Sequence, residues 1–411
     1  GLRYMAVIFH NCRLIDGIAK IPRDNCDVIV DGDSIASVEN SRQWSDGEHK
    51  IVPATGSSLL PGLIDCHSHY IFDPWLANPK DVFEQAKREP DAAVILRAAR
   101  NARVALQAGV TTTRDAGAPR QLNFALRDAI DAGLIPGPRL LAPGLAITIT
   151  GGHGTMFGIE ADGIVELQKA VREQMRDGAD VIKIVASEAA MLTTAEAGVE
   201  EFTQEEIKIL VQEARRRGLR IFSHAQNSTS LVRSARAGVD SVEHGFLANP
   251  EAIAVLKEHD TALVPTLAVT AATLELSDIS PTYRRRILEI RDLHWASCEE
   301  AIRQGIKVVA GTDCGMPGVL PSMINREICL LHKRGLSKME AIQAATSKAA
   351  ELLGLEKQVG SVQPGKQADV ILVQGNPHED LSCLDTVDLV MKAGHVLHQR
   401  QHMEAHHNPK F

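Results

Sequence analysis

Short apolar segments rich in β-branched residues alternate with longer amphipathic segments through the middle of the chain. The amphipathic segments predict helices at residues 92–108, 164–177, 203–217 and 282–304. Thr203-Gln-Glu-Glu206 has the pattern of a capping box, which marks the start of one of them. Eight strands alternating with helices over about 290 residues predict an α/β fold, a (β/α)8 TIM barrel. The expected strands are the segment leading to His67 and residues 110–113, 139–142, 181–185, 219–222, 241–243, 262–264 and 307–310.

The two ends of the chain have a different pattern. Residues 1–60 alternate short apolar stretches with turns, and Asp31-Gly32 between two Val/Ile runs predicts a β-hairpin. Residues 360–397 repeat this alternation. We therefore expect residues 1–60 and 355–411 to meet in one composite β-sandwich domain, and residues 61–354 to form the barrel.

Composition narrows the classes of partner. The 44 Lys and Arg against 52 Asp and Glu give a net charge of -8, which disfavours an electrostatic grip on nucleic acid or an anionic membrane. The sequence has no run of about 18 apolar residues, so we expect no membrane span. Seven cysteines without a CxxC pair predict reduced thiols in a cytoplasmic protein. We expect a small molecule as the partner, and we also expect a homo-oligomer.

Candidate metal ligands lie on five of the expected strands. Alternation along strand 1 puts His67 and His69 on the same face, where they can share one cation. In a barrel enzyme the chemistry lies at the carboxyl ends of the strands. Imidazoles and a carboxylate suit zinc, manganese, iron or nickel better than magnesium or calcium. The candidates are His67 and His69 on strand 1, Lys183 on strand 4, His224 on strand 5, His244 on strand 6 and Asp313 at the end of strand 8.

Each candidate also has a structural interpretation. A single histidine in a strand is more often a hydrogen-bonded structural residue than a ligand. The joint pattern is much harder to obtain by chance. Lys183 is the unusual member, because an ammonium group would repel metal ions. A neutral lysine amine can instead react with carbon dioxide to form a carbamate, an anionic ligand that can bridge two cations.

With this pattern the chain resembles the amidohydrolase superfamily over nearly its whole length. The resemblance includes residues 60–69 (Leu-Pro-Gly-Leu-Ile-Asp-Cys-His-Ser-His) and residues 360–373 (Gly-Ser-Val-Gln-Pro-Gly-Lys-Gln-Ala-Asp-Val-Ile-Leu-Val). Residues 111–117, 150–154 and 242–245 are similar to the imidazolonepropionase-related group, which holds prolidase-like and Xaa-Arg dipeptidases.

This resemblance implies a site for two divalent metal ions, with zinc the first expectation. It also implies that a hydroxide bridging the metals attacks a carbon–nitrogen bond, and that Asp313 passes its proton to the leaving nitrogen. The implied substrate is a dipeptide or an N-acyl amino acid, with carbamates, ureas or cyclic amides as the alternative. The implied ligands are His67, His69 and Asp313 for the buried metal, His224 and His244 for the more exposed metal, and carboxylated Lys183 between them.

Three further residues are candidates for substrate contact. His153 lies in a glycine-rich loop after strand 3, where it is expected to face the mouth of the barrel. Arg114 could bind a substrate carboxylate, although an ion pair with Asp115 is slightly favoured. Tyr70 follows the HxH motif at a position where some relatives carry a carboxylate-binding arginine.

Other residues are expected to have no role in the site. Two cysteines next to ligands, Cys66 and Cys314, are expected to have a packing role. Three histidines in helical segments, His259, His294 and His332, are expected at the surface. The histidine-rich tail is expected to be a solvated end, and it contains His402, His406 and His407.

Two rival functions fit the sequence less well. Amidohydrolase deaminases generally lack the strand-4 lysine and carry a glutamate three residues after the strand-5 histidine, whereas this chain has Lys183 and Asn227. A non-catalytic scaffold would be expected to have lost ligands, and every ligand position here is filled. Strand 5 reads His-Ala-Gln where relatives usually read His-Ala-His, which leaves the substrate open. The long loops at residues 71–91 and 187–202 are expected to form the pocket walls, the second as a lid.

Overall fold

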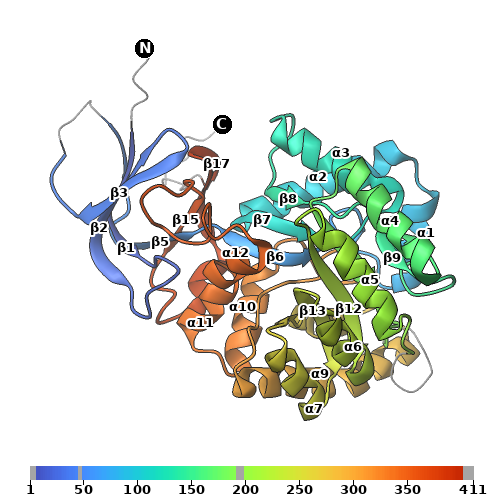
Figure 1. The fold of residues 1–411 in the computed structure, drawn as a ribbon. Helices are drawn as coiled ribbons and strands as arrows, with labels where there is room; N and C mark the ends of the chain where they lie inside the picture. Colours follow the sequence, from blue (N-terminus) through green and yellow to red (C-terminus); the bar gives the residue numbers. More distant parts are fainter. Residues whose placement is uncertain (1–5, 45–48, 191–198, 401–411) are drawn as a thin grey trace, which may run out of the picture.

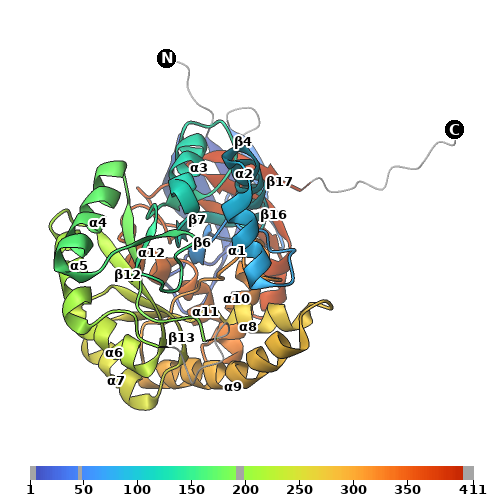
Figure 2. The same ribbon diagram turned by 90° about the vertical axis from the view of Figure 1, so that its right-hand side faces the viewer.

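Parallel strands and surrounding helices form the larger part of the molecule. The computed structural model describes residues 6–44, 49–190 and 199–400. Helices α4 (Gly163–Asp177), α5 (Gln204–Arg215), α6 (Ser228–Ala237), α7 (Pro250–Glu258) and α9 (Pro281–Gln304) lie on the outer side of the strands in Figures 1 and 2. Every pairing within the two barrel sheets is parallel, and the fold is the expected (β/α)8 barrel. One sheet has the order β6 (Leu63–Ser68), β7 (Val110–Asp115), β8 (Arg139–Leu141); the other has the order β10 (Gly158–Glu160), β9 (Ala146–Thr148), β11 (Val181–Val185), β12 (Arg220–Asn227), β13 (Ser241–Leu247), β14 (Ala262–Val264).

The expected eighth strand is an irregular segment that closes the barrel. It forms isolated parallel bridges, Leu263 with Val308 on one side and Ser68 with Cys314 on the other. The backbone at Asp313 has a φ of 58°, which interrupts a regular ladder. The segment thus carries Asp313 beside the end of β6, although residues 307–313 form no continuous strand.

The helices follow the sequence prediction closely. Thr203 and Glu206 form the expected capping box at the start of α5. Residues 71–91, expected as a loop, contain a helix that begins after the Asn78 cap. The helices are α1 (Pro79–Arg88), α2 (Asp91–Gln107), α3 (Leu122–Asp131), α4 (Gly163–Asp177), α5 (Gln204–Arg215), α6 (Ser228–Ala237), α7 (Pro250–Glu258), α8 (Leu267–Ala272), α9 (Pro281–Gln304), α10 (Ile324–Lys333), α11 (Lys338–Ala344) and α12 (Ser347–Leu353).

Both ends of the chain contribute strands to one sheet, as expected. The hairpin predicted at Asp31-Gly32 joins β2 to β3, and the antiparallel pair β5 and β15 joins the two ends of the chain. An apolar cluster that includes Phe9, Leu59 and Val370 lies against this sheet. The domain boundaries near residues 60 and 355 remain a prediction. The strands are β1 (Val7–Leu14), β2 (Arg23–Asp31), β3 (Ser34–Asn40), β4 (Lys50–Pro53), β5 (Ser57–Pro61), β15 (Val370–Gln374), β16 (Val387–Lys392) and β17 (His395–Gln399).

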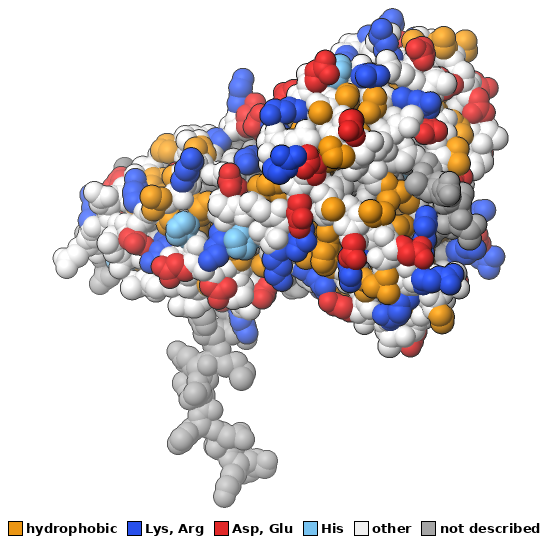
Figure 3. Space-filling model, turned by 90° about the horizontal axis from the view of Figure 1, so that it is seen from below, with side chains coloured by type: hydrophobic (Ala, Val, Ile, Leu, Met, Phe, Trp, Pro, Cys, Tyr) orange, Lys and Arg blue, Asp and Glu red, His pale blue; other side chains and the backbone are white. Residues whose placement is uncertain are grey.

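The surface carries both signs of charge. On the face shown in Figure 3, acidic and basic side chains are interspersed. Among the described residues, no helix has the length and apolar character needed to cross a membrane. The histidine-rich tail that includes His402, His406 and His407 lies outside the described residues.

Candidate functional site

All six predicted metal ligands line one cavity at the carboxyl ends of the barrel strands. The cavity contains about 590 Å³ of atom-free space, including its opening to solvent. Apolar side chains such as Phe83, Phe157 and Met316 form much of its remaining wall. The predicted ligands in the lining are His67, His69, Lys183, His224, His244 and Asp313.

Hydrogen bonds fix the orientation of the two strand-1 imidazoles. His67 Nδ1 lies 2.7 Å from a carboxylate oxygen of Glu243, and His69 Nδ1 lies 3.2 Å from the carbonyl oxygen of Gly117. The Gly117 carbonyl can only accept, so the His69 ring proton is on Nδ1 and its Nε2 keeps a lone pair. Both Nε2 atoms face Asp313, at 3.4 Å from His67 and 3.5 Å from His69. Ligand atoms of these three residues lie within 4.8 Å of one another, which makes them a possible metal site.

The other two imidazoles lie beside this group. His244 Nδ1 is 2.8 Å from Thr266 Oγ1, and that hydroxyl donates its own proton to the Pro265 carbonyl. The imidazole must therefore be the donor, which again leaves Nε2 as a lone pair. The ring centroids of His224 and His244 are 4.6 Å apart, and His224 Nε2 is buried without a hydrogen-bond partner. A lone pair of this kind suits a metal ion.

Burial sets the protonation preferences of the cluster. Burial lowers the pKa of His67, His224 and His244 well below the usual range and that of His69 to about 3, so these imidazoles are neutral near pH 7. Burial also lowers the pKa of Lys183 to about 8, which increases the fraction of neutral amine. The donor set therefore fits divalent metal ions.

The backbone is strained where the ligands leave the strands. His244 has a φ of 72° and Thr266 a φ of 54°, like the left-handed Asp313 described above. Such conformations cost about 1–3 kcal/mol each for residues other than glycine, and they concentrate at functional sites. This turn of the backbone lets Glu243 and His244, which are consecutive, both reach His67.

A buried carboxylate joins the eighth segment to strand 1. Asp65 accepts hydrogen bonds from Thr312 N at 2.9 Å, Thr312 Oγ1 at 2.6 Å and His67 N at 3.1 Å. Burial raises the pKa of Asp65 to about 6 despite these donors. The contacts hold Asp313 next to the strand-1 histidines.

Of the three candidate substrate contacts, only His153 reaches the cavity. Its ring centroid lies 4.8 Å from that of His224. Glu201 fixes this loop, because its carboxylate accepts hydrogen bonds from His153 N at 2.5 Å and from Thr148 Oγ1 at 2.8 Å. Tyr70 is fully buried in the apolar core instead of lining the cavity.

The expected ion pair between Arg114 and Asp115 is wrong. Consecutive residues of β7 point to opposite faces, so the two side chains diverge. Arg114 is buried beneath the cavity and pairs with Glu243 at 2.9 Å, while Asp115 accepts a hydrogen bond from Asn123 at 2.7 Å. Arg114 is therefore not placed to bind a substrate carboxylate in the cavity.

One helical histidine also departs from its prediction. His294 is fully buried, and its Nε2 lies 2.7 Å from the Pro265 carbonyl oxygen. His259 is exposed and His332 is half-buried. Because α9 is polar over most of its length, its sequence did not indicate the buried face on which His294 lies. By contrast, Cys66 and Cys314 are buried in apolar clusters, as expected.

Sequence reasoning missed several residues that line the cavity or lie beneath it. Glu243 carried no signal, because strand alternation predicts that it points away from its neighbour His244. Gln226 and Tyr283 line the cavity from β12 and α9, but neither belongs to a local motif. Pro79 of α1 and Ala189 do come from the two segments expected as walls. Residues 191–198, the middle of the expected lid, lie outside the described residues.

Comparisons with known proteins agree with this arrangement. Residues 58–397 match the family model described as the amidohydrolase family. An ochratoxinase from Aspergillus niger is 30% identical over 351 residues, 79% of this chain and 71% of that protein. A crystal structure of a Xaa-Pro dipeptidase with bound methionine in the active site is 30% identical with a TM-score of 0.85, covering 95% of this chain and 99% of that one. A prolidase complexed with N-methylphosphonate-L-proline is 25% identical with a TM-score of 0.88, covering 96% and 100%. The chain belongs to the amidohydrolase family.

Proposed function

We propose that this protein is a metal-dependent hydrolase that cleaves the amide bond of a dipeptide or an N-acyl amino acid. Membership of the family supports hydrolysis of a carbon–nitrogen bond. The observation that carries the proposal is the convergence of four imidazoles, one carboxylate and one buried lysine on a single cavity. The similarity to a Xaa-Pro dipeptidase and a prolidase supports a dipeptide-like substrate.

The proposed cofactor is a pair of divalent ions, with zinc as the first choice. When bound, such ions polarise a carbonyl oxygen and make water a stronger acid. The buried lysine would be carboxylated, which requires the neutral amine that burial favours. The proposed ligands are His67, His69 and Asp313 for one ion, His224 and His244 for the other, and carboxylated Lys183 for both.

The residues around the ions have separate proposed tasks. Asp313 would accept the proton of the attacking water and deliver it to the leaving nitrogen, a task open to a carboxylate that lines the cavity beside the proposed ions. His153, beside His224, would hydrogen-bond the substrate. Phe83 and Phe157 would pack on the apolar part of the substrate and exclude water.

The direct test is a substrate screen with zinc-loaded protein. The library would contain Xaa-Pro dipeptides, Xaa-Arg dipeptides and N-acyl amino acids, with release of the free amino acid as the readout. We expect turnover of at least one class and its loss in Asp313→Asn. No turnover of any of these classes would contradict the proposed substrate.

Carbamates and ureas form the second candidate class. Among the described residues, the cavity lining has no arginine, and Lys183 is its one lysine. A substrate carboxylate therefore lacks an additional cationic anchor there, whereas an uncharged carbamate or urea needs none. The same screen extended to aryl carbamates and ureas separates the two classes. A cytoplasmic location and a homo-oligomeric state remain predictions.

A further inference from the structure

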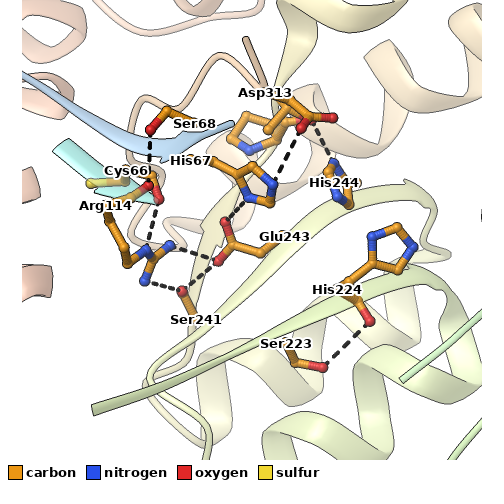
Figure 4. Close-up of polar contacts among 12 residues, drawn as sticks. Cys66, His67, Ser68, Arg114, Ser223, His224, Ser241, Glu243, His244 and Asp313 are labelled. Atoms are coloured by element: carbon orange, nitrogen blue, oxygen red, sulfur yellow. Dashed lines mark hydrogen bonds and ion pairs between the residues drawn. The ribbon is translucent and has the colours of Figure 1, made fainter. Parts of the chain in front are cut away.

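A buried polar network lies directly beneath His67 and joins three strands of the barrel, β6, β7 and β13. Arg114 Nη2 is 2.9 Å from Glu243 Oε1, and the other carboxylate oxygen, Oε2, is 2.7 Å from His67 Nδ1 (Figure 4). Ser241 Oγ lies 2.6 Å from Glu243 Oε1 and 3.1 Å from Arg114 Nη1. The side chains of Arg114, Glu243 and His67 are at most 2% exposed.

The remaining contacts of Arg114 hold it in one position. Its Nε donates a hydrogen bond to the Cys66 carbonyl at 2.7 Å, and its guanidinium carbon lies 3.8 Å from the centroid of the Phe222 ring. A buried arginine with these partners can rotate only by breaking several hydrogen bonds. Arg114 is therefore a fixed donor beside Glu243.

The donor and acceptor roles in the network follow from this fixed arginine. Guanidinium can only donate, so Ser241 Oγ accepts from Arg114 and is free to donate its own proton to Glu243. Glu243 Oε1 thus receives two donors. Glu243 is the ion-pair partner of Arg114 and therefore a carboxylate, and a carboxylate can only accept hydrogen bonds. His67 Nδ1 must then carry the ring proton.

We propose that Glu243 is a positioning residue that, held in place by Arg114 and Ser241, fixes His67 in the tautomer whose Nε2 lone pair faces the cavity. Arg114 acts through Glu243 and has no contact with substrate. The affinity of the cavity for a divalent ion then depends on this buried ion pair. The proposal rests on the proposed metal-dependent function for its effect on binding, while the tautomer itself is a property of the metal-free protein.

The substitution Glu243→Gln is informative because it keeps the shape and removes the charge. The new amide would turn its oxygen toward Arg114 and Ser241, since an amide N–H facing the guanidinium would place donor against donor. Its N–H group would then point at His67 Nδ1 and require that atom to accept. The ring proton would move to Nε2 and occupy the lone pair intended for the metal.

The experiment measures the zinc affinity of metal-free protein by competition with a chromogenic chelator. Glu243→Gln is expected to bind zinc about 10- to 100-fold more weakly than wild type, the range seen when such supporting partners are removed. The double variant with Glu243→Gln and Arg114→Met is expected to bind more tightly than the single variant. Without the guanidinium, the amide can donate to Ser241 and offer its oxygen to His67.

Glu213→Gln is the matched control. Glu213 is also nearly buried and ion-paired, with Arg172 at 3.0 Å, but it lies on α5 and touches no cavity histidine. The zinc affinity of the Glu213→Gln variant should equal that of wild type. Unchanged zinc affinity in Glu243→Gln, or a double variant that binds zinc more weakly than the single one, would overturn the proposal, because the proposed tautomer control requires that loss of the guanidinium lets the amide turn its oxygen toward His67.

A second measurement avoids any folding defect of the variants. A neutron crystal structure of metal-free wild type should show the His67 ring deuterium on Nδ1, and a deuterium on Nε2 would overturn the proposal. The two proposals can fail separately. A wild type that binds no zinc would refute the proposed metal-dependent function, while the neutron structure would still decide the tautomer.

Discussion

Gly315, two residues after Asp313, offers a sharp test of how the strand-1 histidines are held. Its backbone has a φ of +104°, and a Cβ built there would lie 2.3 Å from the carbonyl oxygen of His69. That contact would have to open to at least 3.0 Å. The obstacle is backbone, so no side-chain rotation relieves it. Gly315→Ala must therefore move His69 or the segment that carries Asp313.

The control Gly218→Ala separates the cost of the left-handed backbone conformation from the cost of the close contact. Gly218 also has a positive φ, +71°, but a Cβ added there would meet no atom within 4 Å in the folded chain. Its substitution costs only the left-handed conformation, about 1–2 kcal/mol. Gly315→Ala adds forced displacement in a packed interior, about 1–3 kcal/mol more. The required opening, from 2.3 Å to at least 3.0 Å, also exceeds the tolerance of about 0.2 Å for metal–ligand distances, whether His69 or the segment that carries Asp313 moves.

The assay combines thermal unfolding of metal-free protein with zinc affinity by chelator competition. Gly315→Ala should unfold at a lower temperature than Gly218→Ala and bind zinc at least about 10-fold more weakly. Gly218→Ala should keep wild-type zinc affinity. If the two variants match in both measurements, the close approach of Gly315 to His69 does not hold the site.

Three further predictions concern the lysine, a buried carboxyl and the apolar wall. Lys183→Ala should lower zinc content to at most one ion per chain and kcat/KM at least about 100-fold, measured by elemental analysis and steady-state kinetics; two retained ions with full activity would refute the bridging role. Burial raises the pKa of Glu327 to about 8 although two backbone N–H groups donate to its carboxylate. The folded protein then holds this proton more tightly than the unfolded chain, so the stabilisation is complete below about pH 4.5 and is lost as the pH rises to 8. Urea unfolding should show wild type losing stability relative to Glu327→Gln between pH 5 and 8, and the opposite slope would contradict this. Phe83→Ala should raise KM about 10-fold for substrates with an aromatic group and less than about 2-fold for alanine analogues; equal effects would rule out a specificity role.

The barrel could be predicted because the periodicity of apolar residues and the strand positions of the candidate ligands lead to the same fold. Alternation placed His67 and His69 on one face, and counting strands brought Lys183 and His224 to the same end of the barrel. Residues 307–313 were harder to predict, because the left-handed Asp313 breaks the ladder that their apolar pattern suggests. Their place in the barrel follows from hydrogen bonds to both neighbouring segments, which pattern alone does not specify.

The supporting residues could not be found from local sequence. Glu243 and Arg114 are 129 positions apart, and their pairing depends on which faces of β13 and β7 meet inside the barrel. The expected partner, Asp115, was chosen by adjacency, which is a poor guide in a strand. His294 shows the same limit, because a polar helix still buries one stripe. Long-range packing decides these positions.

The central claim is that the cavity holds two divalent ions through its six candidate ligands. The most direct test is the zinc-to-protein ratio of wild type, measured by elemental analysis after metal removal, repletion with zinc in the presence of bicarbonate, and gel filtration. The account predicts two zinc ions per chain. A ratio of one or less would contradict it.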